Sequence, residues 1–212
     1  MKILSGIAVL ALLTAGAATP SFATAITPGA TVVPNTVTFG GTFTSLGSIA
    51  TTYAIDGDSG QVGASVGTWS LNPFGANDLT FVYQVFVNTG DVARVTGSNF
   101  SGFSLDVEQA PFGSSTNAAV TADLNTLGVV GFNFTPPLSN ELTAGQETYL
   151  LIVNTNATAF NPGIISVIDG ATATVDGFET TTAATPEPST LSLLGTGLLA
   201  VGAGLRRKMR RK

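Results

Sequence analysis

LTFVYQVFV, residues 79–87, is the stretch that decides the fold. Its odd-numbered positions, from Leu79 to Val87, are all apolar, and Val82 and Phe86 add apolar side chains to the other face. Alternation with a period of two is typical of a β-strand, and apolar residues on both faces indicate a strand inside a sheet. The sequence therefore predicts a central strand here.

Similar runs fill residues 24–183, separated by turns rich in Gly, Asn, Asp and Pro, and none has helical spacing. The run at 103–108, FSLDVE, alternates apolar and polar residues, so Asp106 and Glu108 are expected on the solvated face of a strand. Many short strands rich in Thr and Val predict an all-β, antiparallel β-sandwich over residues 24–183, Ig-like or jelly-roll in topology. Further strands are expected at 36–39, 49–55, 62–71, 92–96, 118–122, 129–134, 148–154, 164–168 and 171–178.

The first 23 residues have the pattern of a signal peptide. Lys2 precedes a mostly apolar run at 3–13, and the small residues Ser21 and Ala23 occupy the −3 and −1 positions of a cleavage site. An uncleaved anchor is the alternative, but the apolar run is short and has no basic residues beyond it. We therefore expect signal peptidase to remove residues 1–23 and the chain to be exported across the inner membrane.

Residues 184–212 form a three-part segment. A Pro-Glu-Pro element precedes 15 uncharged residues, 191–205, which span about 22 Å as a helix and need snorkelling basic side chains to cross a hydrocarbon core of ~30 Å. A basic cluster then ends the chain and is expected to stay cytoplasmic, which leaves the sandwich outside. The sequence predicts a single C-terminal transmembrane helix. The element is Pro186, Glu187 and Pro188, and the basic anchor is Arg206, Arg207, Lys208, Arg210, Arg211 and Lys212.

The order of these three parts resembles the PEP-CTERM sorting signal of Gram-negative bacteria, over about the last 27 residues. The resemblance implies recognition by exosortase, a membrane protease-transferase, with processing at or near Pro186–Pro188. It also implies a membrane-anchored intermediate that is later delivered to the cell surface or the extracellular polymeric matrix.

The charge and residue types of the exported part exclude several function classes. Between Thr24 and Thr185 there are twelve acidic residues and one base, Arg94, a net charge of −11 that repels nucleic acid. This part contains no His, Cys or Lys, so it has no Ser-His or Cys-His nucleophile, no Schiff-base lysine and no usual zinc site. We expect no cofactor and a non-enzymatic surface or matrix protein, associated with exopolysaccharide or a biofilm.

A carbohydrate- or calcium-binding surface module is the alternative. Asp56 and Asp58 lie two residues apart in a Gly-bent loop, DGDSG, where carboxylates can chelate calcium, although a hairpin turn explains the loop equally well. Trp69 and Tyr83 would have to be exposed to stack on a sugar, whereas a lone Trp is more often a core residue.

A carboxylate-based glycoside hydrolase is a second alternative. Asp106 and Glu108 would be about 6 to 7 Å apart along one strand face, which suits a pair of catalytic carboxyls but supplies no cleft. Arg94 is expected to pair with an acid such as Asp91 or with one across the sheet.

Overall fold

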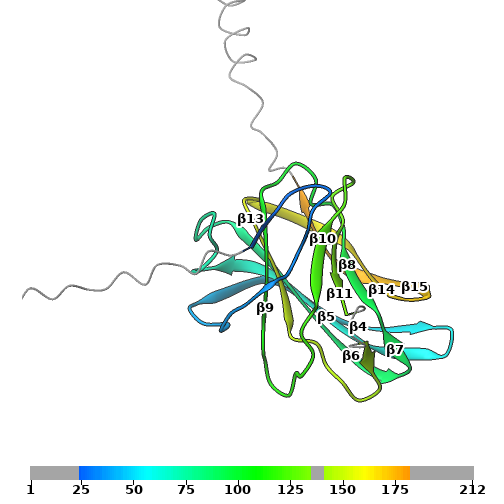
Figure 1. The fold of residues 1–212 in the computed structure, drawn as a ribbon. Helices are drawn as coiled ribbons and strands as arrows, with labels where there is room; N and C mark the ends of the chain where they lie inside the picture. Colours follow the sequence, from blue (N-terminus) through cyan, green and yellow to red (C-terminus); the bar gives the residue numbers. More distant parts are fainter. Residues whose placement is uncertain (1–23, 135–140, 182–212) are drawn as a thin grey trace, which may run out of the picture.

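The computed structural model describes residues 24–134 and 141–181, which form an all-β sandwich of two antiparallel sheets (Figure 1). The seven-stranded sheet has the order β1-β9-β13-β6-β5-β4, with β3 pairing parallel to β9. The six-stranded sheet has the order β15-β14-β8-β11-β10-β2, and β12 and β7 form a small third sheet. The strands are β1 Thr24–Ile26, β2 Thr31–Val32, β3 Asn35–Thr36, β4 Phe43–Ile55, β5 Asp58–Trp69, β6 Leu79–Thr89, β7 Asp91–Val92, β8 Arg94–Gly97, β9 Leu105–Ala110, β10 Thr121–Leu124, β11 Val130–Asn133, β12 Leu142–Thr143, β13 Leu150–Thr155, β14 Ala159–Asp169 and β15 Ala171–Thr181.

The central strand expected from the sequence is β6, which pairs with β13 on one side and β5 on the other. Its odd-numbered residues from Leu79 to Val87 all lie in the main core, and Val82 lies in a second cluster on the opposite face. The period of two therefore predicted both the position and the two-sided burial of this strand.

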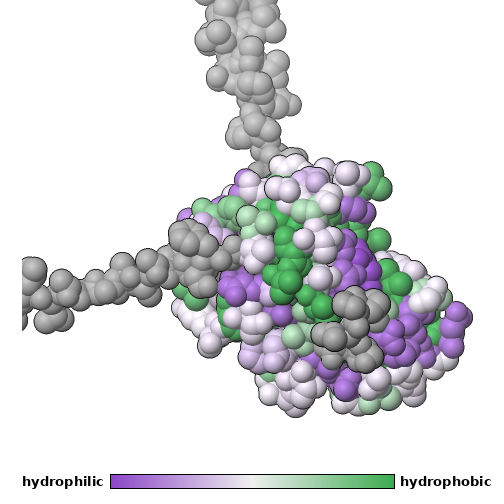
Figure 2. All heavy atoms as spheres, in the orientation of Figure 1, coloured by the Kyte–Doolittle hydropathy of each residue, from purple (hydrophilic) through white to green (hydrophobic). Residues whose placement is uncertain are grey.

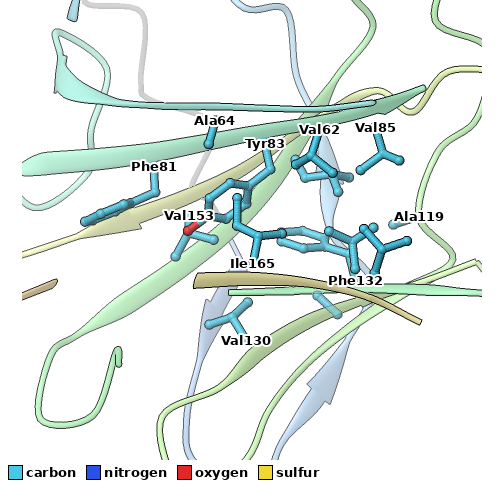
Figure 3. Packing of buried hydrophobic residues seen from close by; sticks show 14 of the residues in the cluster. Val62, Ala64, Phe81, Tyr83, Val85, Ala119, Val130, Phe132, Val153 and Ile165 are labelled. Carbon is cyan, nitrogen blue, oxygen red and sulfur yellow. The ribbon is translucent and has the colours of Figure 1, made fainter. Parts of the chain in front are cut away.

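The main core lies between the two large sheets. Figure 3 shows Phe81 and Tyr83 of one sheet pointing toward Phe132 and Ile165 of the other, and all four are almost fully buried. A buried aromatic or aliphatic side chain contributes about 1.5 to 3 kcal/mol relative to an exposed one, so this layer supplies most of the driving force for folding. On the face drawn in Figure 2, an apolar band is flanked by polar residues.

A second cluster covers the outer face of the seven-stranded sheet. Trp69 stacks on Phe39, with ring centroids 5.2 Å apart, and its indole Nε1 donates to the Gly40 carbonyl oxygen at 2.7 Å. Phe43 packs against the same cluster. The segment between β3 and β4 thus lies across this face and shields part of it from water. In a simple two-layer sandwich the outer face of each sheet would meet water.

Two hairpins extend beyond the strand runs expected from the sequence. β4 and β5 join through Asp56 and Gly57, both at positive φ (45° and 98°), which is the conformation of a two-residue hairpin turn. β14 and β15 pair along eleven positions and join at Gly170 (φ 67°). Figure 1 shows both turns at the same end of the sandwich.

The strand expected at 36–39 is instead the two-residue strand β3, because the chain leaves the sheet edge there to cover the outer face. No helix of membrane-spanning length and apolarity occurs within 24–134 and 141–181. The signal peptide expected at 1–23 and the helix expected in the C-terminal segment lie outside the described residues.

Candidate functional sites

Three aspartates from separate turns meet at one end of the sandwich. Asp58 begins β5, Asp91 begins β7 and Asp169 ends β14, so each belongs to a different sheet. One carboxylate oxygen from each lies within 4.8 Å of the other two, and all three side chains are partly buried. We call Asp58, Asp91 and Asp169 the acid cluster.

The acid cluster concentrates negative charge. The pKa of Asp169 rises to about 6, because it shares a hydrogen bond with Asp91, is partly shielded from water, and lies close to the charges of Asp91 and Asp58. Tyr53, 3% exposed, lies near the same charges: burial first, and then Asp58 and Asp169, raise its pKa to about 12. Its hydroxyl has no hydrogen-bond partner in the described part of the chain.

The fold separates the two aspartates of the loop that the sequence suggested for calcium. Asp56 is exposed at the tip of the β4–β5 turn and does not join the acid cluster, whereas Asp58 does. The sequence did not predict that Asp91 and Asp169 lie beside Asp58. Each lies next to a glycine in a turn, which is a common turn sequence. Only the strand order shows that these turns meet.

Asp106 and Glu108 are not on a solvated face, which corrects the expectation from their alternating pattern. They are only 2% and 4% exposed. The reason is that β9 is an inner strand, with β13 on one side and β1 and β3 on the other. The outer face beside them is also covered, since Val37 packs against the cluster that contains Ala110.

A single amide bridges these two acids. Asn154 Nδ2 donates to Asp106 Oδ2 at 3.0 Å and to Glu108 Oε2 at 3.1 Å, while Thr80 Oγ1 donates to Asn154 Oδ1 at 2.8 Å. Asn72 Nδ2 donates in turn to Thr80 Oγ1 at 3.1 Å. A polar network therefore crosses three strands within the sheet.

Burial raises the pKa of both carboxyls. Burial raises the pKa of Asp106 to about 6, and burial together with the charge of Asp106 raises that of Glu108 to about 7, while the bond from Asn154 opposes both shifts. Perturbed carboxyls often mark active sites, but structural networks perturb them too. These two face one amide inside a sheet rather than each other across a cleft.

Arg94 forms an ion pair across the six-stranded sheet. Its guanidinium makes two contacts with the Asp123 carboxylate, one of them Nη2 to Oδ1 at 2.8 Å, and Nη1 donates to Asn133 Oδ1 at 2.5 Å. It crosses β11 over Gly131, where a Cβ would lie 2.0 Å from Nη2. Burial opposes the effect, but hydrogen bonds from Arg94 and Asn133 and the guanidinium charge hold the pKa of Asp123 below its usual value.

The two aromatic residues that a sugar platform would need are buried: Trp69 is 2% and Tyr83 1% exposed. A groove of about 310 Å³ lies instead on the outer face of the seven-stranded sheet. Its lining contains three phenylalanines, several hydroxyl and amide side chains and no acid. They include Phe39, Phe43, Phe112, Ser48, Ser65 and Gln84.

Beyond the sandwich, residues 184–208 match the PEP-CTERM protein-sorting motif. The chain is an exosortase substrate. The match includes Pro186–Pro188 and the first three bases of the C-terminal cluster, and such proteins are exported and membrane- or surface-associated. No curated protein and no solved structure matches the chain, so the sorting motif is the basis of its assignment.

The PEP-CTERM motif follows the sandwich closely. β15 ends at Thr181 and the matched region starts at residue 184, so only Thr182 and Ala183 lie between them in sequence. The motif implies a membrane segment, and the sorting residues and the basic anchor lie outside the described residues. The exosortase substrate thus combines one β-sandwich with its sorting signal.

Proposed function

We propose that this exosortase substrate is a non-enzymatic protein of the cell surface or extracellular matrix, associated with exopolysaccharide or a biofilm. The observation that carries the proposal is the sorting motif at 184–208 placed directly after a single β-sandwich. Exosortase processes the chain near Pro186–Pro188 and separates the sandwich from its membrane segment. The acidic charge of the exported part keeps it soluble in that location.

The absence of catalysis is part of the proposal. Asp106 and Glu108 are the acids whose spacing suited a hydrolase, and they are buried and bridged by Asn154. A glycosidase needs its two carboxyls to flank a sugar in a cleft. The groove on the outer face is lined by no Asp or Glu. These facts support a binding or structural role rather than turnover.

Mass spectrometry of the protein from cells with and without exosortase tests the sorting step. With exosortase we expect the surface or matrix form to lack peptides that contain Lys212, and without it we expect the intact chain to stay in the inner membrane. A variant with Pro186, Glu187 and Pro188 all replaced by Ala should behave as in the cells without exosortase. Replacing Thr182 and Ala183 by Ser is the matched control, and it should be processed normally. Persistence of Lys212 in both strains would mean a plain single-span anchor.

Exopolysaccharide binding is a second candidate, favoured by the groove on the outer face. Phenylalanine faces beside hydroxyl and amide groups suit the alternating apolar and polar faces of a sugar chain. Affinity electrophoresis in gels that contain the producing cell's exopolysaccharide tests this. Phe112, 55% exposed, is the residue to change: Phe112→Ser should abolish retardation. Leu127 is 77% exposed and does not line the groove, so Leu127→Ser should leave retardation unchanged. Equal migration of both variants and the parent would exclude this groove.

A further inference from the structure

The acid cluster brings together side chains from three separate strands at this end of the sandwich. Its carboxylates come from the start of β5, the start of β7 and the end of β14. These strands belong to all three sheets. Anything bound by all three carboxylates would therefore tie the two large sheets together.

No cationic side chain balances this charge among the described residues. Arg94 is the one base in the described ranges, and its guanidinium is held by Asp123 and Asn133. Three carboxylates within 4.8 Å repel one another, and the repulsion is relieved by a proton or by a cation. Extracellular modules bind calcium through such carboxylates with dissociation constants of about 0.1 to 1 mM.

The buried hydroxyl of Tyr53 is a second feature, separate from the carboxylates, that points to a ligand. Its side chain is 97% buried, its hydroxyl has no hydrogen-bond partner among the described residues, and it lies within the influence of Asp58 and Asp169. Its ring crosses Gly60, where a Cβ would lie 2.6 Å from the hydroxyl oxygen. Buried polar groups without a partner cost about 1 to 3 kcal/mol, so native proteins rarely leave them unsatisfied. A water bound to an ion in the acid cluster would supply the missing partner.

The backbone is shaped to admit the carboxylates. Gly90, at φ 76°, precedes Asp91, and a Cβ at Gly90 would lie 1.7 Å from Asp58 Oδ1. Only a residue without a Cβ lets the Asp58 side chain lie against the β6–β7 turn. The close approach of Asp58 and Asp91 thus depends on the residue type at position 90.

We propose that Asp58, Asp91 and Asp169 bind a calcium ion that clamps the two sheets at this end of the sandwich. Two oxygens bound to one calcium ion at about 2.6 Å can be up to ~5.2 Å apart, so oxygens within 4.8 Å of one another fit a single ion. The partly buried setting leaves the remaining positions of a six- to eight-oxygen shell for water and backbone carbonyls. This is the irregular, oxygen-rich coordination that calcium accepts and magnesium tolerates poorly.

Calorimetric titration and thermal unfolding of the full-length chain in a non-ionic detergent test the site, with Trp69 fluorescence reporting unfolding. Calcium chloride is the probe. We expect saturable binding of one ion with a dissociation constant on the order of 0.1 to 1 mM, as in extracellular modules. At 10 mM calcium the unfolding temperature should rise by roughly 5 °C.

Variants separate this site from nonspecific binding to an acidic protein. Asp91→Asn and Asp169→Asn should lose the response, yet be at least as stable as the parent in EDTA, because each removes a repelling charge. Asp56→Asn removes the same charge from the neighbouring turn and should keep the response. Tyr53→Phe should stay folded and bind calcium about fivefold more weakly, the effect of one hydrogen bond.

Four results would overturn the proposal. They are the absence of saturable binding by the parent up to 10 mM calcium, an unchanged response in Asp91→Asn or Asp169→Asn, loss of the response in Asp56→Asn, and an equal response to magnesium. Calorimetry on the parent decides the question even if a variant does not fold. The test uses purified chain, so its outcome is independent of whether exosortase sorts the protein.

Discussion

Replacing Glu108 by Gln tests the energetics of the buried acid pair. The substitution keeps the shape of the side chain and an oxygen that accepts from Asn154, but it removes the titratable group. The pKa of Glu108 is raised in the folded protein, so the unfolded chain loses this proton first as pH rises. The stability that the protonated form contributes is therefore complete below about pH 4.5 and is lost as pH rises through about 7. Glu108→Gln should be immune to that loss.

The size of the effect follows from the two pKa values. The difference between 4.5 and about 7 corresponds to about 3 kcal/mol at ~1.36 kcal/mol per pKa unit. Glu108 is 4% exposed, so water screens little of this cost. We expect Glu108→Gln to change the free energy of unfolding by less than about 1 kcal/mol at pH 4.5 and to raise it by about 2 to 3 kcal/mol at pH 8.

Urea unfolding at a series of pH values measures this difference, with Trp69 as the fluorescent probe. Trp69 is the single tryptophan of the chain and is buried, so its emission reports loss of the native state. Glu141→Gln, at an exposed position, is the matched control and should give parallel curves. A stability gain from Glu108→Gln that is equal at pH 4.5 and pH 8, or a loss at pH 8, would refute the assignment of a buried carboxyl with a raised pKa.

Two further substitutions test close contacts seen in the structure. Gly90→Ala should lower the free energy of unfolding by about 2 to 4 kcal/mol, because it combines a strained positive φ with a clash against Asp58. Gly170 also has a positive φ, but no atom lies within 4 Å of the position of its Cβ. Gly170→Ala should therefore lower the free energy of unfolding by only about 1 kcal/mol in the same urea assay. Arg94→Met should cost about 1 to 3 kcal/mol at pH 7 by leaving Asp123 without its cation. Because the pKa of Asp123 is lowered in the folded protein, the stability from this ion pair is present above about pH 3.8 and is lost as pH falls. The free energies of unfolding of the parent and Arg94→Met should therefore converge near pH 2 in acid titrations. A difference between them that stays constant with pH would contradict the ion-pair explanation.

The sequence predicted the strands in which apolar and polar residues alternate. The sequence predicted the strand at 79–87 because its apolar residues repeat with period two, and it predicted a strand at 164–168 from a short run of β-branched residues without helical spacing. It did not predict that β14 begins at Ala159, because Pro162 and Gly163 normally end a strand. Pro162 lies in the part of β14 that pairs with β15 alone, since the pairing with β8 begins only at Ile165, and proline is found in strands mainly at such edges.

The candidate site was harder to foresee because its members are distant in sequence. Asp58, Asp91 and Asp169 each sit in an ordinary turn motif, and only the strand order brings these turns together. Asp106 and Glu108 failed as a prediction for a different reason. Alternation distinguishes the two faces of a strand, but it does not report whether the second face meets water or another layer of chain. In this sandwich the second face is covered.

The β14–β15 hairpin sets the distance between the acid cluster and the residue at which the described sandwich ends. β15 starts beside the acid cluster and ends at Thr181, next to the sorting motif, so its eleven residues span about 35 Å between the two. The acid cluster therefore lies at the end of β15 that is opposite to Thr181. A cation bound by the acid cluster would therefore brace the end of the sandwich that lies a full strand length from Thr181.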